Sequence, residues 1–102
     1  MEDKRIELHA LLVGILGSEN VYFQPPSSIL MEYPAIVYSR SAIDNKQANN
    51  KIYKQDVKYS ITLIDDDPDS QYISELLALP KCKFDRCFSA DDLNHTIFTL
   101  YY

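Results

Sequence analysis

Apolar residues near the start of the chain recur at helical spacing. Counted from Leu8, they fall at positions i, i+3, i+4, i+7 and i+8, which is the apolar stripe of an amphipathic helix. The stripe consists of Ile6, Leu8, Leu11, Leu12, Ile15 and Leu16. Gly17 follows directly, at a place where a left-handed residue can end a helix. The pattern predicts a helix over residues 3–16.

Five later segments are typical of strands, because aromatic and β-branched residues concentrate in them. The predicted strands cover residues 21–23, 33–38, 53–64, 83–89 and 95–101. The third alternates between apolar and polar residues, as a half-buried strand does. Its apolar face consists of Val57, Tyr59, Ile61 and Leu63. The last two strands are separated by a short turn, which predicts an antiparallel hairpin.

A second helix is predicted over residues 69–79. Asp67 or Asp69 can cap its N-terminus, and Pro80 stops it because proline disrupts a helix interior. The apolar residues that we expect this helix to bury are Tyr72, Ile73, Leu76, Leu77 and Leu79.

Residues 40–52 are polar, contain three Asn and show no hydrophobic period. The segment is therefore either a long loop or a hairpin arm that reaches away from the core. Loops of this length in a compact domain are more often functional than incidental.

The order of elements predicts an α+β fold in one domain spanning residues 1–102. Helix, three strands, helix and two strands favour one mostly antiparallel, mixed sheet with both helices packed on one face. A chain of 102 residues, 46% hydrophobic, has room for a single core.

Charge and hydropathy exclude several classes of protein. Ten Lys and Arg against fifteen Asp and Glu give a net charge of −5, which is unfavourable for tight nucleic-acid binding. No apolar run approaches the ~20 residues of a membrane span, so we expect no membrane association. No secretory signal is recognisable at the N-terminus, and we expect Cys82 and Cys87 to be free thiols on opposite faces of a strand.

The residues that could carry chemistry do not complete a catalytic or metal site. Asp65, Asp67 and Asp69 open like a calcium loop, but Ser70 stands where Gly is needed and Leu76 where a bidentate Glu is needed. A capped helix and a solvated turn explain these carboxylates better. A thiol nucleophile with His95, and a nuclease site built from Asp56, Asp85, Lys58 and Lys83, lack a supporting motif. We expect no enzyme activity, no metal and no cofactor.

The C-terminal residues 98–102 are apolar and aromatic up to the last residue of the sequence. A strand of this kind is an aggregation hazard at a sheet edge unless it is paired, either internally or with another subunit. With eight Tyr in the chain, this favours a self-assembling module. The alternative is a strand in the middle of the sheet.

Several blocks together resemble the tail terminator and tail completion proteins of long-tailed bacteriophages and prophages. They are "VYFQPP" (21–26), "YPAIVYSR" (33–40), "YSITLID" (59–65) and "SELLALP" (74–80), in the element order above. The resemblance implies a non-enzymatic head-tail joining protein with an open sheet packed against two helices. It would form a ring, usually hexameric, that caps the tail tube and joins it to the head connector. The last hairpin is an addition to the family's minimal core.

The resemblance also implies partners and contact residues. The partners are further copies of the chain, the tail tube protein and the head-connector protein, with DNA passing through the ring and the protein moving from the host cytoplasm into the virion. Residues 40–52 correspond to the family's long hairpin arm. The candidate contact residues are Asp44, Asn45, Asn49, Asn50, Tyr53, Tyr101 and Tyr102. The alternative is a small acidic module that docks a partner through an exposed edge strand.

Overall fold

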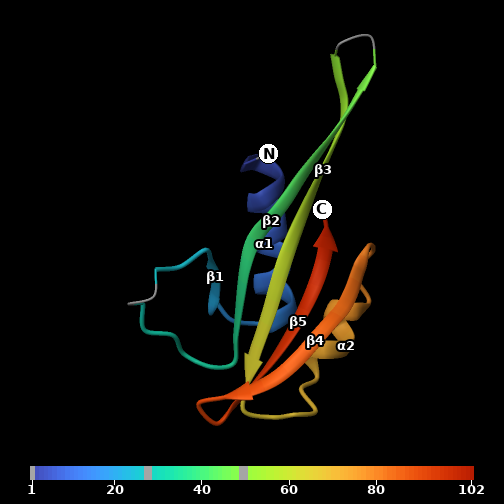
Figure 1. Cartoon of the computed structure of the whole chain (residues 1–102). Helices are drawn as coiled ribbons and strands as arrows, with labels where there is room; N and C mark the ends of the chain where they lie inside the picture. Colours follow the sequence, from blue (N-terminus) through green and yellow to red (C-terminus); the bar gives the residue numbers. More distant parts are fainter. Residues whose placement is uncertain (1, 27–28, 49–50) are drawn as a thin grey trace.

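Two helices and five strands follow one another in the predicted order (Figure 1). A computed structural model describes residues 2–26, 29–48 and 51–102; for Glu2, 44–48 and 51–56 it describes the backbone alone. The elements are α1 (Glu2–Leu16), β1 (Val21–Phe23), β2 (Ala35–Ala48), β3 (Lys51–Asp65), α2 (Tyr72–Leu77), β4 (Cys82–Ala90) and β5 (Leu93–Tyr101). The predicted α+β class is confirmed.

The five strands form one mixed sheet in the order β1-β2-β3-β5-β4. β1 pairs parallel to β2, and the other neighbouring pairs are antiparallel. β5 therefore lies between β3 and β4, so of the two alternatives for the C-terminal strand the place inside the sheet is confirmed, and not the sheet edge. β4 occupies that edge because the last hairpin turns outward and brings its first strand to the outside (Figure 1).

The core lies between the sheet and the two helices, which both pack on the same face (Figure 1). α1 contributes Leu8, Leu12 and Leu16, one residue per turn, and α2 contributes Leu76. The sheet contributes Val21, Ile36, Tyr38, Val57, Tyr59, Ile61, Leu63, Phe98 and Leu100. The alternation predicted for β3 is thus confirmed. The buried stripe of α1 is narrower than predicted, because Ile6 and Leu11 are exposed.

Gly17 ends α1 as predicted. Its backbone has φ of 70°, and its N–H donates to the Val13 carbonyl at 2.9 Å. The left-handed conformation turns the chain out of the helix and toward β1, and a residue without Cβ adopts it at least cost.

α2 is shorter than predicted, and the expected aspartate cap is wrong. The N-cap residue is Gln71, whose side chain makes no capping hydrogen bond. Asp65 and Asp67 instead accept backbone N–H bonds from the residues two positions later, at 3.2 and 2.9 Å. These hydrogen bonds close local turns ahead of the helix, so the two carboxylates do not cap its N-terminus. Of the apolar residues expected to be buried by α2, only Leu76 is fully so, and Leu77 faces solvent.

β2 and β3 extend together well beyond the rest of the sheet and form a two-stranded arm (Figure 1). The arm accounts for the elongated shape of the molecule, which measures 52 × 26 × 23 Å. Of the two alternatives for residues 40–52, the hairpin arm is confirmed for the described residues 40–48 and 51–52, and the irregular loop is wrong there. β2 consequently continues to Ala48, ten residues past the predicted end of that strand.

Candidate interaction surfaces

The arm consists of residues 42–48 and 51–57, which pair only with each other in the part of the chain that the structure describes. β1 ends at Phe23, opposite Tyr38, and β5 ends at Tyr101, opposite Lys58. Beyond these residues, the Val57 carbonyl accepts from the Tyr102 N–H, and no described strand lies beside the other outer N–H and C=O groups of the arm. An isolated two-stranded hairpin is marginally stable in water, and unpaired strand edges are templates for further pairing.

The register of the arm places like charges opposite each other. Asp44 is the cross-strand partner of Asp56, and Lys46 is the partner of Lys54. Like charges directly opposite on two strands are destabilising. The arm is therefore not optimised for its own stability as a free hairpin.

The structure brings the described candidate contact residues to the arm and to its base. Asp44 and Asn45 lie in β2 and Tyr53 in β3, while Asn49 and Asn50 lie outside the described residues. Tyr101 pairs with Lys58, and the Tyr102 N–H donates to the Val57 carbonyl at 3.1 Å. The two C-terminal tyrosines are each 37% exposed at the base of the arm. Their proximity to the arm is a product of the tertiary fold.

The outer edge of β4 is a second candidate surface, which the sequence analysis did not identify. Phe84 is 52% exposed and Phe88 46% exposed, and no described strand pairs with the outer side of β4. Phe84 meets Phe98 edge-to-face at 6.4 Å, and Phe88 stacks on His95 at 4.7 Å. A backbone irregularity between Phe84 and Arg86 separates the two aromatic residues onto opposite faces of the sheet.

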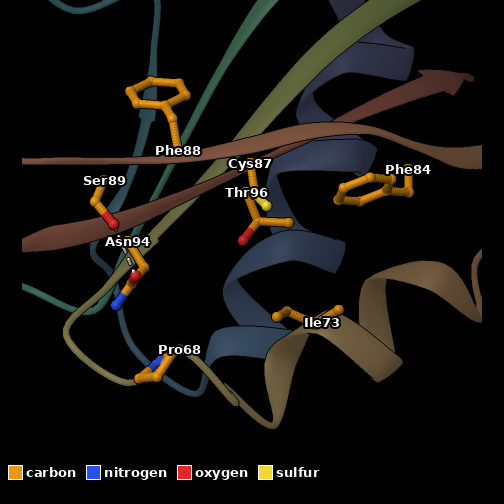
Figure 2. A pocket seen from close by; sticks show the side chains of 8 residues that line it. All are labelled: Pro68, Ile73, Phe84, Cys87, Phe88, Ser89, Asn94 and Thr96. Carbon is orange, nitrogen blue, oxygen red and sulfur yellow. Dashed lines mark hydrogen bonds between the residues drawn. The ribbon is translucent and has the colours of Figure 1, made fainter.

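An open pocket of about 220 Å³ lies between β4 and the segment that contains α2 (Figure 2). Figure 2 shows the Cys87 and Thr96 side chains directed toward Ile73 of α2, with Phe88 on the other side of the strand. The lining residues are Pro68, Ile73, Phe84, Cys87, Phe88, Ser89, Asn94 and Thr96. Asn94 ties the two turns at this end together, since its amide donates to the Asp66 carbonyl at 3.4 Å.

The two cysteines are free, but the prediction that they face opposite sides is wrong. The irregularity after Phe84 shifts the register by one residue, so that Cys82 pairs with Leu100 and Cys87 with Thr96 on one face. Burial raises the pKa of the Cys82 thiol, which disfavours the nucleophilic thiolate. Cys87 and His95 occupy opposite faces, because His95 pairs with Phe88. The arrangement does not align a thiol with an imidazole.

The carboxylates of the acidic turn do not converge. Asp65 and Asp67 accept hydrogen bonds from the backbone N–H groups of Asp67 and Asp69, as described above. Within the part of the chain that the structure describes, no three His, Cys, Asp or Glu side chains gather at metal-binding spacing. None of the described helices is long and apolar enough to cross a membrane.

Comparisons with known proteins found no match: no family model, no curated protein and no solved structure resembles the chain at a significant level.

Proposed function

We propose that the protein is a non-enzymatic assembly subunit of the tail terminator type. Copies of the chain would associate side by side into a ring, as the resemblance implies, with a hexamer as the expected stoichiometry. The ring would cap a phage tail tube and contact the head connector. The observation that carries this proposal is the arm, whose two strands pair only with each other among the described residues.

The architecture supports the proposal in two ways. An open sheet with two helices on one face and a long hairpin arm is the arrangement that the resemblance implies. The unpaired edges of the arm and the edge of β4 lie on different parts of the molecule (Figure 1). Head-to-tail contacts between two different surfaces generate rings when the rotation between subunits closes. The net charge of −5 would let DNA pass through such a ring without being held.

Removal of the arm tests the proposal. In the variant, residues 44–56 are replaced by Asn-Gly, which can join Ile43 to its cross-strand partner Val57 by a two-residue turn. We expect the wild-type chain to form oligomers in light scattering, alone or with tail tube protein, and the variant to stay monomeric. Circular dichroism and thermal unfolding establish that the body of the variant is folded. A wild-type chain that remains monomeric at high concentration and in the presence of tail tube protein would contradict the proposal.

The edge of β4 favours a second candidate function, that of a module that docks an extended segment of a partner. Phe84 and Phe88 stand on either face of an edge strand, next to the pocket under β4. A strand added to such an edge gains main-chain hydrogen bonds, and pockets for its side chains give specificity. Phe88→Lys would place a charge on this edge, which disfavours the addition of another strand, and would leave the arm unchanged. Loss of partner binding in Phe88→Lys, with binding retained in the armless variant, would favour the docking module over the ring subunit.

A further inference from the structure

Two arginine side chains from distant parts of the chain meet at one aromatic ring near the base of the arm. The guanidinium of Arg5, on α1, lies 4.5 Å from the centre of the Phe23 ring. The guanidinium of Arg40, on β2, lies 5.5 Å from the same centre. Phe23 in turn packs against Tyr38, with ring centres 4.9 Å apart. The two cations are thus held on aromatic surface, where a guanidinium stacks favourably.

The hydroxyl of Tyr38 is the point on which these groups converge. Tyr38 is fully buried, and its hydroxyl oxygen lies 2.7 Å from Nδ1 of His9. Burial raises the pKa of Tyr38, whereas hydrogen bonding to Arg5 and the positive charges of Arg5 and Arg40 lower it. Burial, and then the charge of Arg5, lowers the pKa of His9. Two permanent positive charges and an imidazole with a lowered pKa therefore lie near one hydroxyl.

These arginines have no acidic partner among the described side chains. The ion pair found there joins Lys4 to Glu7 on the surface of α1. Nε of Arg40 and the hydroxyl oxygen of Tyr59 are also buried without a hydrogen-bond partner among the side chains that the structure describes. Arg40 and Tyr59 are cross-strand partners, so both side chains face the helices. A buried donor without an acceptor costs free energy, and two cations near each other repel.

We propose that Arg5 and Arg40 form a binding site for an oxyanion beside the Tyr38 hydroxyl. A phosphate or carboxylate group matches the planar fork of a guanidinium, and it would supply the missing acceptor for Nε of Arg40. Two sources share this chemistry: free phosphate, and an aspartate side chain of a second copy. The proposal stands without the assembly function, because a monomer can bind phosphate here.

Inorganic phosphate is the probe for the test, titrated at constant ionic strength against chloride. We expect Tm to rise with the logarithm of the phosphate concentration above Kd, by roughly 5–10 °C when phosphate reaches ten times its Kd. Arg40→Gln should abolish this rise, whereas the matched control Arg86→Gln, an exposed arginine on β4, should retain it. The His9 imidazole signals in NMR should shift along the same binding curve in the wild type.

Three results would overturn the proposal: no rise in Tm relative to chloride, an equal rise in Arg40→Gln, or His9 signals that do not move along a saturating curve with phosphate. If Arg40→Gln does not fold, Arg5→Gln and the wild-type His9 titration decide. Light scattering in the same titration separates the two sources. Phosphate that dissociates a wild-type oligomer identifies the second copy's carboxylate as the occupant. Phosphate binding without any change in mass identifies a free anion, and neither result depends on ring formation.

Discussion

His9 and Tyr38 join α1 to β2 through one short polar contact beside the apolar core. Neither residue is recognisable as part of a site from the sequence, because a lone histidine in a helix and a tyrosine in a strand carry no local signal. The pair is unusual because two positively charged side chains, Arg5 of α1 and Arg40 of β2, lie near it. Residue-level properties of this kind depend on which side chains the fold brings together.

The first prediction concerns pH. The pKa of His9 is lowered from its ordinary value of 6.5, so between the lowered value and 6.5 the unfolded chain binds more protons than the native chain. The contribution of His9 to the free energy of unfolding is therefore complete above pH 6.5. It falls as the pH drops below 6.5, and it levels off below the lowered pKa of the folded state. Urea unfolding at a series of pH values measures this slope. His9→Gln should flatten the slope between pH values of about 7 and 5, and an unchanged slope would refute the assignment.

A pair of phenylalanines gives the second prediction. Phe98 is fully buried on β5, and Phe84 is its half-exposed edge-to-face neighbour on β4. Phe98→Ala should lower the free energy of unfolding by about 3–5 kcal/mol, because it leaves a cavity between the sheet and the helices. Phe84→Ala removes the same group from the surface and should cost about 1 kcal/mol or less. Denaturant unfolding compares the two, and equal losses would contradict the placement of β5 in the interior.

At the scale of elements, the sequence predicts the bounds of a helix or strand most accurately where a hydrophobic period continues over many residues and one face is buried. α1 and the alternating half of β3 lie within a residue or two of their predicted positions. α2 was predicted too long, since prolines and aspartates mark where a helix can begin and end but not how much of it tertiary packing stabilises. The arm has no hydrophobic period from which its strands could be predicted, because its strands extend beyond the core.

The two glycines of the chain give a third prediction, in opposite directions. Both have open space at the position of a Cβ atom, so neither substitution causes a clash. Gly14 lies inside α1 with no left-handed φ, and Gly14→Ala should stabilise the protein by about 0.5–1 kcal/mol. Gly17 has φ of 70°, and Gly17→Ala should destabilise it by about 1 kcal/mol. Thermal unfolding of the two variants should move Tm in opposite directions; a shared direction would show that the end of α1 is misplaced.

At the scale of the whole molecule, charge is segregated along the long axis. Residues 40–58 contain five of the ten Lys and Arg but two of the fifteen Asp and Glu, so this segment carries +3 and the rest of the chain −8. The turns at the other end of the sheet, which Asn94 ties together, contain Asp65, Asp66, Asp67, Asp69, Asp91 and Asp92. Opposite charges at opposite ends favour head-to-tail encounters between copies.

This segregation gives the fourth prediction. Self-association through the arm should weaken as NaCl rises from about 0.05 to about 0.5 M, because salt screens exposed charges over about 10 Å or less. Sedimentation velocity measures the oligomer fraction at each salt concentration. Lys46→Glu combined with Lys54→Glu should reduce association at low salt, with Lys83→Glu, outside the arm, as a control. Association that strengthens with salt would point instead to an apolar interface such as the edge of β4.

The sequence by itself determined the class of the fold, the order of its elements and the apolar face of each regular segment, because period and turn chemistry are local. Only the tertiary structure decided which strand forms the edge, that residues 42–48 pair with residues 51–57 as an arm, and that one backbone irregularity puts both cysteines on one face. It also decided that Arg5 and Arg40 meet at Phe23. Strand partners and convergent side chains are long-range choices, set by where the whole chain can bury its core, and no local pattern encodes them.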